Sequence, residues 1–291
     1  MSGIGYSVSE ALLPSLVIAL LAFFSWRASW VFWAMVLLLV MPLLILRLLR
    51  GHEQRHQAYL DAYAAEHNEQ AAPDTPTATT STTSHRPRRR HWTRAEVIRD
   101  PLFYLYLPAI TTLPVLFTGF MFHQVHLVEE KGWPLALWGG LYVLYALTTT
   151  VMKLLAGVLI DRFSAMVMAP LMSLPLALGL LILASSDHVL AAVVFMALLG
   201  VSTGFYSTMI APFFSEKYGN RHLGAIKSLA TAVMVFASAI APVIMGWLID
   251  RGTAMNSMAL GGVLYILIAS AMAAWAWQLH QRSLPPPALQ V

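Results

Sequence analysis

The chain has 291 residues, of which 58% are hydrophobic and only 11% are charged, and its mean hydropathy is +0.66. A soluble domain carries about 25% charged residues, so this composition excludes an ordinary soluble protein. The apolar residues gather into continuous runs of about 20, the length that spans a bilayer as a helix. These runs lack the in/out alternation of a membrane β-barrel. We therefore predict an all-α integral membrane protein, a polytopic helical bundle.

Several functional classes are disfavoured by what the sequence lacks. It has no cysteine, which excludes disulfides, thiolate catalysis and cysteine-based metal sites. It has neither a phosphate-binding Walker A pattern nor an H-E-x-x-H pattern, so neither an ATPase nor a membrane zinc protease is supported. We predict that the protein is not an enzyme and has no cofactor. The net charge of +4 reflects membrane orientation rather than nucleic-acid binding.

Eight membrane spans are predicted, two before residue 50 and six after residue 100. The spans are 9–25, 31–49, 102–128, 135–159, 166–184, 189–213, 229–249 and 257–277. A turn at 26–30 with two tryptophans at headgroup level separates the first two. The predicted domains are a two-helix segment, a partly disordered basic loop, a six-helix half and a short tail, at residues 1–49, 50–100, 101–280 and 281–291.

The loop at 50–100 contains two further signals. Thr93 and Glu96 have capping-box spacing, which predicts a short helix that ends before Pro101. The basic run from Arg86 to Arg90 would attract anionic lipid.

The positions of the basic residues predict the orientation of the chain. With eight spans, 15 of the 18 lysines and arginines belong to one side, and the other side holds the remaining three, which are Arg27, Lys131 and Arg251. The side rich in basic residues faces the cytoplasm. We therefore expect a multi-pass protein of the cell (inner or plasma) membrane, with both termini and the 50–100 loop in the cytoplasm.

The last six spans contain a repeated six-residue pattern. The hexad Gly157–Arg162 ends the second of these spans, and the similar hexad Gly246–Arg251 ends the fifth. By the predicted orientation, Asp161 faces the cytoplasm and Asp250 faces the opposite side. Equivalent helices of opposite orientation are typical of the inverted repeats of secondary transporters. The alternative is coincidence, because these residue types are common at helix ends.

Three stretches carry a resemblance to a known family. They are Gly157-x-x-x-Asp161-Arg162, Tyr218-Gly219-x-Arg221-His222-Leu223-Gly224-Ala225-Ile226-Lys227-Ser228 and Arg99-Asp100-Pro101-x-Phe103. They resemble cytoplasmic motifs of the major facilitator superfamily, in its monocarboxylate and oxalate/formate-antiporter-like branch. That fold has twelve helices, and this chain is similar to helices five to twelve, so we expect an N-terminally truncated member.

The resemblance implies a function. It implies secondary active transport of a small solute, an organic anion such as a monocarboxylate, by alternating access in the lipid bilayer. A chain that supplies the missing helices is a candidate partner. The alternative is a truncated, non-transporting membrane protein or a partner-binding subunit.

Lys153 is the first candidate site residue, because an ionisable group at membrane depth usually faces a cavity or a partner. Monocarboxylate carriers have an arginine four residues before the glycine that Gly157 resembles, so the resemblance makes Lys153 the contact for an anionic solute. Those carriers have an acid at the position of Thr149, and its absence here puts proton coupling at this site in doubt. The alternative is that Lys153 snorkels to the cytoplasmic interface.

The other candidates lie at several places along the spans. Thr149, His123, Gln124 and Tyr145 are predicted solute contacts. Tyr145, like Trp138, Tyr142 and Tyr206, could equally face lipid. A metal site at His123 and His126 lacks a second ligand pair, and we predict none. We expect an external helix end in water at His126, Glu129, Glu130 and Lys131.

The resemblance places gating contacts at Gly157, Asp161, Arg162 and Arg221. The alternative is that the charges at these positions only reflect the ordinary excess of positive residues on the cytoplasmic side. Gly200-x-x-x-Gly204 predicts close helix contact.

Overall fold

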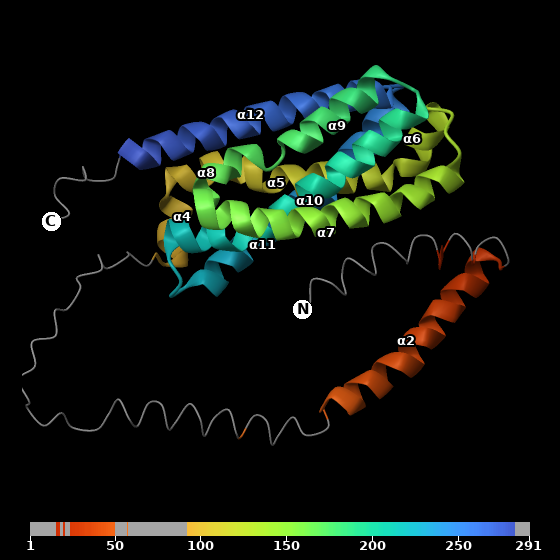
Figure 1. The fold of residues 1–291 in the computed structure, drawn as a ribbon, viewed down its shortest axis with the longest axis horizontal. Helices are drawn as coiled ribbons and strands as arrows, with labels where there is room; N and C mark the ends of the chain where they lie inside the picture. The colour runs from red at the N-terminus through yellow and green to blue at the C-terminus, as the bar shows by residue number, and fades with distance from the viewer. Residues whose placement is uncertain (1–15, 18–19, 21–23, 50–56, 58–91, 283–291) are drawn as a thin grey trace, which may run out of the picture. The chain divides into compact units, whose positions relative to one another are not determined.

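The computed structural model describes residues 16–17, 20, 24–49, 57 and 92–282. Every regular element in these ranges is a helix and none is a strand (Figure 1). Seven helices within them are long and apolar enough to cross a membrane. The predicted all-α membrane bundle is therefore confirmed. The predicted span at 9–25 and most of the 50–100 loop, including Arg86 to Arg90, lie outside the described residues, as does the tail after residue 282.

The chain divides into two compact units, and one of them, residues 19–88, contains helix α2 (Trp26–Leu49). The turn predicted at 26–30 is wrong, because these residues form the first turns of α2. Ser25 begins the helix, since its hydroxyl oxygen accepts from the amide of Ala28 at 3.4 Å. The segment 26–30 contains neither glycine nor proline, so nothing in it stops a helix.

The other unit contains the remaining helices of the described ranges. They are α4 (Arg94–Arg99), α5 (Pro101–Phe122), α6 (Gln124–Glu130), α7 (Leu135–Phe163), α8 (Ala165–Met168), the 3-10 helix η1 (Ala169–Leu171), α9 (Leu174–Ser185), α10 (Val189–Tyr218), α11 (Leu223–Asp250) and α12 (Met255–Arg282). The predicted spans after residue 100 fall on these helices, but the span at 102–128 is divided at His123 into α5 and α6, and the span at 166–184 consists of α8, η1 and α9. Several helices also continue past the predicted ends. Because hydropathy detects only the apolar part of a helix, the predicted loop at 214–228 shrinks to residues 219–222.

The capping box before α4 is confirmed. The side chain of Thr93 accepts from the amide of Glu96, and the amide of Thr93 donates to the carboxylate of Glu96 at 2.7 Å. Helix α4 ends at Arg99, as the following Pro101 predicts. Asp100 then caps α5, since its Oδ1 accepts from the amide of Leu102 at 3.0 Å. Two short signals in the sequence thus set the junction between α4 and α5.

The long helices form two groups, and the helices of each group pack against helices of the other. We call α5, α7 and α9, with the short helices α6, α8 and η1 that lie between them in the chain, the first triplet, and we call α10, α11 and α12 the second triplet. Helix α5 packs against α11 and α12, helix α10 packs against α7 and α9, and α9 packs against α12 (Figure 1). The first helix of each triplet therefore contacts the second and third helices of the other. This reciprocal pattern favours the inverted repeat over coincidence.

The core lies around α10 and the helices that surround it. Trp138 of α7 is buried and stacks against Phe195 of α10, with ring centroids 6.2 Å apart. The same indole stacks on Trp133 at 6.0 Å. Large apolar side chains on α7 and α11, such as Leu154 and Val243, are exposed, as expected of surfaces that face an apolar solvent.

Candidate functional site

A cavity of about 310 Å³ lies between α5, α7 and α10. Its lining consists of Leu113, Pro114, Phe117, Tyr145, Lys153, Thr203, Tyr206 and Ser207. Two predicted site residues, Lys153 and Tyr145, therefore share one cavity. Because α5 belongs to the first triplet and α10 to the second, the cavity lies at the boundary between the two triplets.

Lys153 is the only charged residue of this lining. It is partly buried on α7, ten residues before the last residue of that helix, Phe163. At 1.5 Å per residue this is about 15 Å along the axis. The position beside the cavity favours the interpretation of Lys153 as a cavity-facing cation over snorkelling to the interface.

Two glycines of α10 bring the helix close to α7 and so position this wall. A Cβ built on Gly204 would lie 2.4 Å from the carbonyl oxygen of Thr149 and 3.1 Å from the amide of Lys153. A Cβ on Gly200 would lie 2.5 Å from the carbonyl oxygen of Tyr145. Only glycine permits so close an approach, so the predicted close contact at Gly200 and Gly204 is confirmed.

The three hydroxyl groups on the α10 side of the cavity each donate to a backbone carbonyl. Thr203 donates to the carbonyl of Leu199 at 2.8 Å, and Ser207 donates to that of Gly204 at 3.0 Å. Their oxygens keep lone pairs, so this wall presents hydrogen-bond acceptors to the cavity. The sequence leaves open whether Tyr206 faces a cavity or lipid, and in the structure it forms part of the cavity lining.

Tyr206 also compensates for a backbone hydrogen bond that α5 lacks. Proline at position 114 has no amide hydrogen, so the carbonyl of Ile110, four residues earlier, lacks its helical partner. The hydroxyl of Tyr206 donates to this carbonyl at 2.9 Å. The contact joins α10 to α5 at the cavity, where Pro114 and Tyr206 both form part of the lining.

The sequence interpretation missed most of the α5 and α10 lining, namely Leu113, Pro114, Phe117, Thr203 and Ser207. One signal was available on α10. Thr203 and Ser207 are four residues apart and therefore share a helix face, next to the glycine pair. The apolar residues of α5 carry no comparable signal, because every span is rich in such residues.

Three predicted solute contacts are not part of this lining. Thr149 is fully buried at the contact of α7 with α10, and its hydroxyl has no hydrogen-bond partner within the described ranges. The Nε2 atom of His123 lies 2.9 Å from the carbonyl oxygen of Pro242 on α11, and Gly246 leaves room for the ring. Gln124 accepts from both Trp138 and Tyr142, at 2.9 and 2.7 Å. Each of the three thus makes helix-to-helix contacts instead.

The predicted gating residues Gly157, Asp161 and Arg162 lie near the end of α7, and Arg221 lies in the turn between α10 and α11. Asp161, Arg162 and Arg221 are exposed, and among the ion pairs of the described part of the chain none involves them. A Cβ on Gly157 would meet no neighbour within 4 Å. Their gating role therefore stays a prediction. The buried ion pair at this end is a different one, Lys217 with Asp100, whose charged atoms lie 3.5 Å apart.

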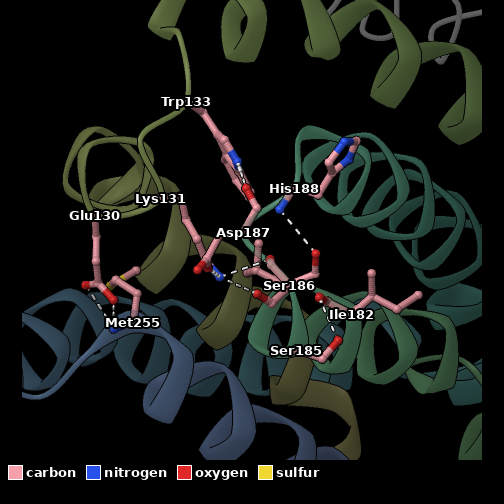
Figure 2. A network of polar contacts seen from close by, with 10 residues as sticks. Glu130, Lys131, Trp133, Ile182, Ser185, Ser186, Asp187, His188 and Met255 are labelled. Carbon is pink, nitrogen blue, oxygen red and sulfur yellow. Dashed lines mark hydrogen bonds and ion pairs between the residues drawn. The ribbon is translucent and has the colours of Figure 1, made fainter.

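The predicted water-exposed helix end at 126–131 is wrong for Lys131, which is buried, with only 6% of the residue exposed. Glu130 is exposed, as predicted, but it also accepts from the amide of Met255 (Figure 2). The hydropathy pattern does not reveal this burial, because the partners lie more than 50 residues away. No group of three metal-ligating side chains occurs in the ranges that the structure describes.

Comparison with known proteins gives one positive result. The sequence model of the Major Facilitator Superfamily matches residues 1–242, which is most of the chain. No curated protein and no solved structure matches the chain. The match agrees with the multi-pass helical bundle and with the cavity at the triplet boundary. The chain therefore belongs to the Major Facilitator Superfamily, a family of membrane proteins that carry out secondary transport of small solutes.

Proposed function

We propose that the chain transports a small organic anion such as a monocarboxylate by alternating access, and that the ammonium group of Lys153 contacts the anion. The observation that supports this proposal is the position of Lys153 on the cavity between α5, α7 and α10. A cation at membrane depth is costly unless it faces a cavity or a partner. Its charge favours a negatively charged solute, in agreement with the resemblance to the monocarboxylate and oxalate/formate branch.

The other walls of the cavity suit a solute with a charged end and an apolar end. Leu113, Pro114 and Phe117 form an apolar wall on α5, which suits the carbon end of such a solute. The volume of about 310 Å³ equals about ten water molecules at ~30 Å³ each. A carboxylate with a few carbon atoms would fit within this space with its charged end at Lys153.

Replacing Lys153 with methionine tests the proposal, because it removes the charge and keeps much of the side-chain volume. We expect binding of radiolabelled lactate, pyruvate or acetate to the reconstituted protein to fall by about tenfold to a hundredfold, the effect of losing a hydrogen bond to a charged group. Lys153→Arg should retain part of the binding. The measurement is a proximity binding assay with each labelled acid in proteoliposomes.

The matched control is Lys227→Met, which removes a lysine that is not part of the cavity lining. This variant should bind the same acids as the unchanged protein. If Lys153→Met and Lys227→Met both bind normally, Lys153 is not the anion contact. If the unchanged protein binds none of the three acids, the solute class is wrong.

We further propose that the loop at 50–100 and both termini face the cytoplasm, as the excess of basic residues on that side indicates. The chain has no cysteine, so single cysteines report the orientation directly. Cysteine at Glu129 should react with an impermeant maleimide added to intact cells, whereas cysteine at His222 should react only after the cells are opened. The reverse pattern would contradict the proposed orientation. Both positions are exposed, Glu129 near the end of α6 and His222 in the turn before α11.

A further inference from the structure

The end of α6 carries a Glu-Lys dipeptide, Glu130 and Lys131, that contacts distant parts of the chain. Both carboxylate oxygens of Glu130 accept from the amide of Met255, at 2.9 and 3.1 Å (Figure 2). Met255 is the first residue of α12, and it lies 125 residues further along the chain. A carboxylate is favourable at this position, because the first amides of a helix lack partners and carry partial positive charge. Glu130 of the first triplet therefore holds the third helix of the second triplet.

The end of α10 carries a second Glu-Lys dipeptide with corresponding contacts. Glu216 accepts from the amides of Ala165 and Met166, at 3.1 and 3.2 Å, and from the hydroxyl of Ser164 at 2.6 Å. These residues begin the segment that leads through α8 into α9. Ser164 has a φ of 71°, which a residue with a side chain rarely adopts. Glu216 of the second triplet therefore holds the start of the third helix of the first triplet.

The lysines that follow the two glutamates also correspond. Lys131 donates to the carboxylate of Asp187 at 2.5 Å, and Lys217 pairs with Asp100 at 3.5 Å. Asp187 lies two residues before α10 and Asp100 lies directly before α5. Each lysine therefore binds an aspartate that precedes the first helix of the other triplet.

Lys131 also contacts the end of a third helix. It donates to the carbonyls of Leu183 and Ser186, at 2.7 and 3.1 Å, at the end of α9 (Figure 2). The side chains of Lys131 and Lys217 are only 1% and 3% exposed, so both lysines are internal to the bundle.

We propose that Glu130–Lys131 and Glu216–Lys217 are equivalent clasps, one at each membrane face, that join the two triplets and hold the cavity between them. The outer clasp is Glu130–Lys131 and the inner clasp is Glu216–Lys217. They are positioning residues: none touches the cavity, but they fix the ends of α5 and α10, whose middle parts form two of its walls. This inference follows from the contacts within the bundle and does not depend on the identity of the solute.

Hydrogen–deuterium exchange of the full chain in lipid nanodiscs tests the proposal, because each glutamate protects backbone amides in the other triplet. In Glu130→Ala, exchange at 255–258 should rise about tenfold, as expected when a charge-assisted hydrogen bond is lost, while exchange at 165–168 stays unchanged. Glu216→Ala should show the reciprocal result. The matched controls Glu129→Ala and His222→Ala change exposed neighbours and should alter neither segment.

Conservative variants keep the test decisive if an alanine variant folds poorly. Glu130→Gln and Glu216→Gln retain an acceptor oxygen, so exchange at the partner segment should rise only about threefold, since a neutral acceptor forms a weaker bond. A partner segment whose exchange is unchanged in both the alanine and glutamine variants would overturn the proposal. So would an increase of equal size throughout all the long helices, because this would indicate general destabilisation and not a local clasp.

Discussion

Adding a single methyl group at Gly204 is expected to destabilise the six-helix unit by about 3 kcal/mol, the upper part of the usual range for overpacking. The new Cβ would lie 2.4 Å from the carbonyl oxygen of Thr149, which is backbone and cannot rotate away. Helices α7 and α10 must therefore separate, and Lys153, whose amide lies 3.1 Å from the same point, moves with α7. Gly204→Ala should lower the melting temperature of the detergent-solubilised protein and weaken anion binding together.

The same substitution at Gly140 provides the control. Gly140 lies within α7, the helix that Gly204 of α10 approaches, but a Cβ on Gly140 would meet no atom within 4 Å. Gly140→Ala should leave stability unchanged or raise it by up to about 1 kcal/mol, because alanine is the better helix former. Equal melting temperatures for the two alanine variants would show that the close approach of α7 and α10 does not contribute to stability.

Replacing Lys217 with methionine should cost about 3–5 kcal/mol, because it leaves the buried carboxylate of Asp100 without its countercharge. Asp100 is 6% exposed and Lys217 is 8% exposed, so water cannot replace the lost partner. The hydroxyl of Tyr218 and the amide of Leu102 still donate to the carboxylate, but neither carries a charge. The measurement is the melting temperature of the solubilised variant, read by fluorescence-detected size-exclusion chromatography.

Two comparisons separate charge burial from simple loss of packing. Adding Asp100→Asn to Lys217→Met should recover a large part of the loss, because asparagine is neutral and remains a good helix cap. Lys131→Met should lower stability less than Lys217→Met does. The side chain of Asp187 is 72% exposed, so its carboxylate stays hydrated when Lys131 is removed. A double variant no more stable than Lys217→Met alone would show that the buried charge is not the cause.

The helices of this fold could be predicted from the sequence. A membrane helix must form its backbone hydrogen bonds internally, and it is recognisable as a long apolar run. The hexads that end at Arg162 and Arg251 also predicted a relation between the two triplets, and the reciprocal helix contacts favour it. The helix ends were less accurate. Polar residues such as Glu216 and Lys217 continue α10 past its apolar part, and hydropathy assigned them to a loop.

The site was predictable only where a residue was unusual for its surroundings. A lysine in an apolar run singled out Lys153, and the structure places it on the cavity. His123 and Gln124 stood out for the same reason, yet they contact other helices. The difference depends on which neighbour each side chain meets. For His123 this is Pro242, 119 residues away, and no local pattern encodes such a pairing.

The contact between Tyr206 and the carbonyl of Ile110 has a consequence for how this sequence can change over generations. Losing Pro114 first would restore the amide that this carbonyl lacks, and the carbonyl has two lone pairs, so it can accept from the amide and from the phenol hydroxyl together. Losing Tyr206 first would leave the carbonyl without its partner inside the protein. Only the first order avoids this cost, so a descendant that lacks Tyr206 should also lack Pro114.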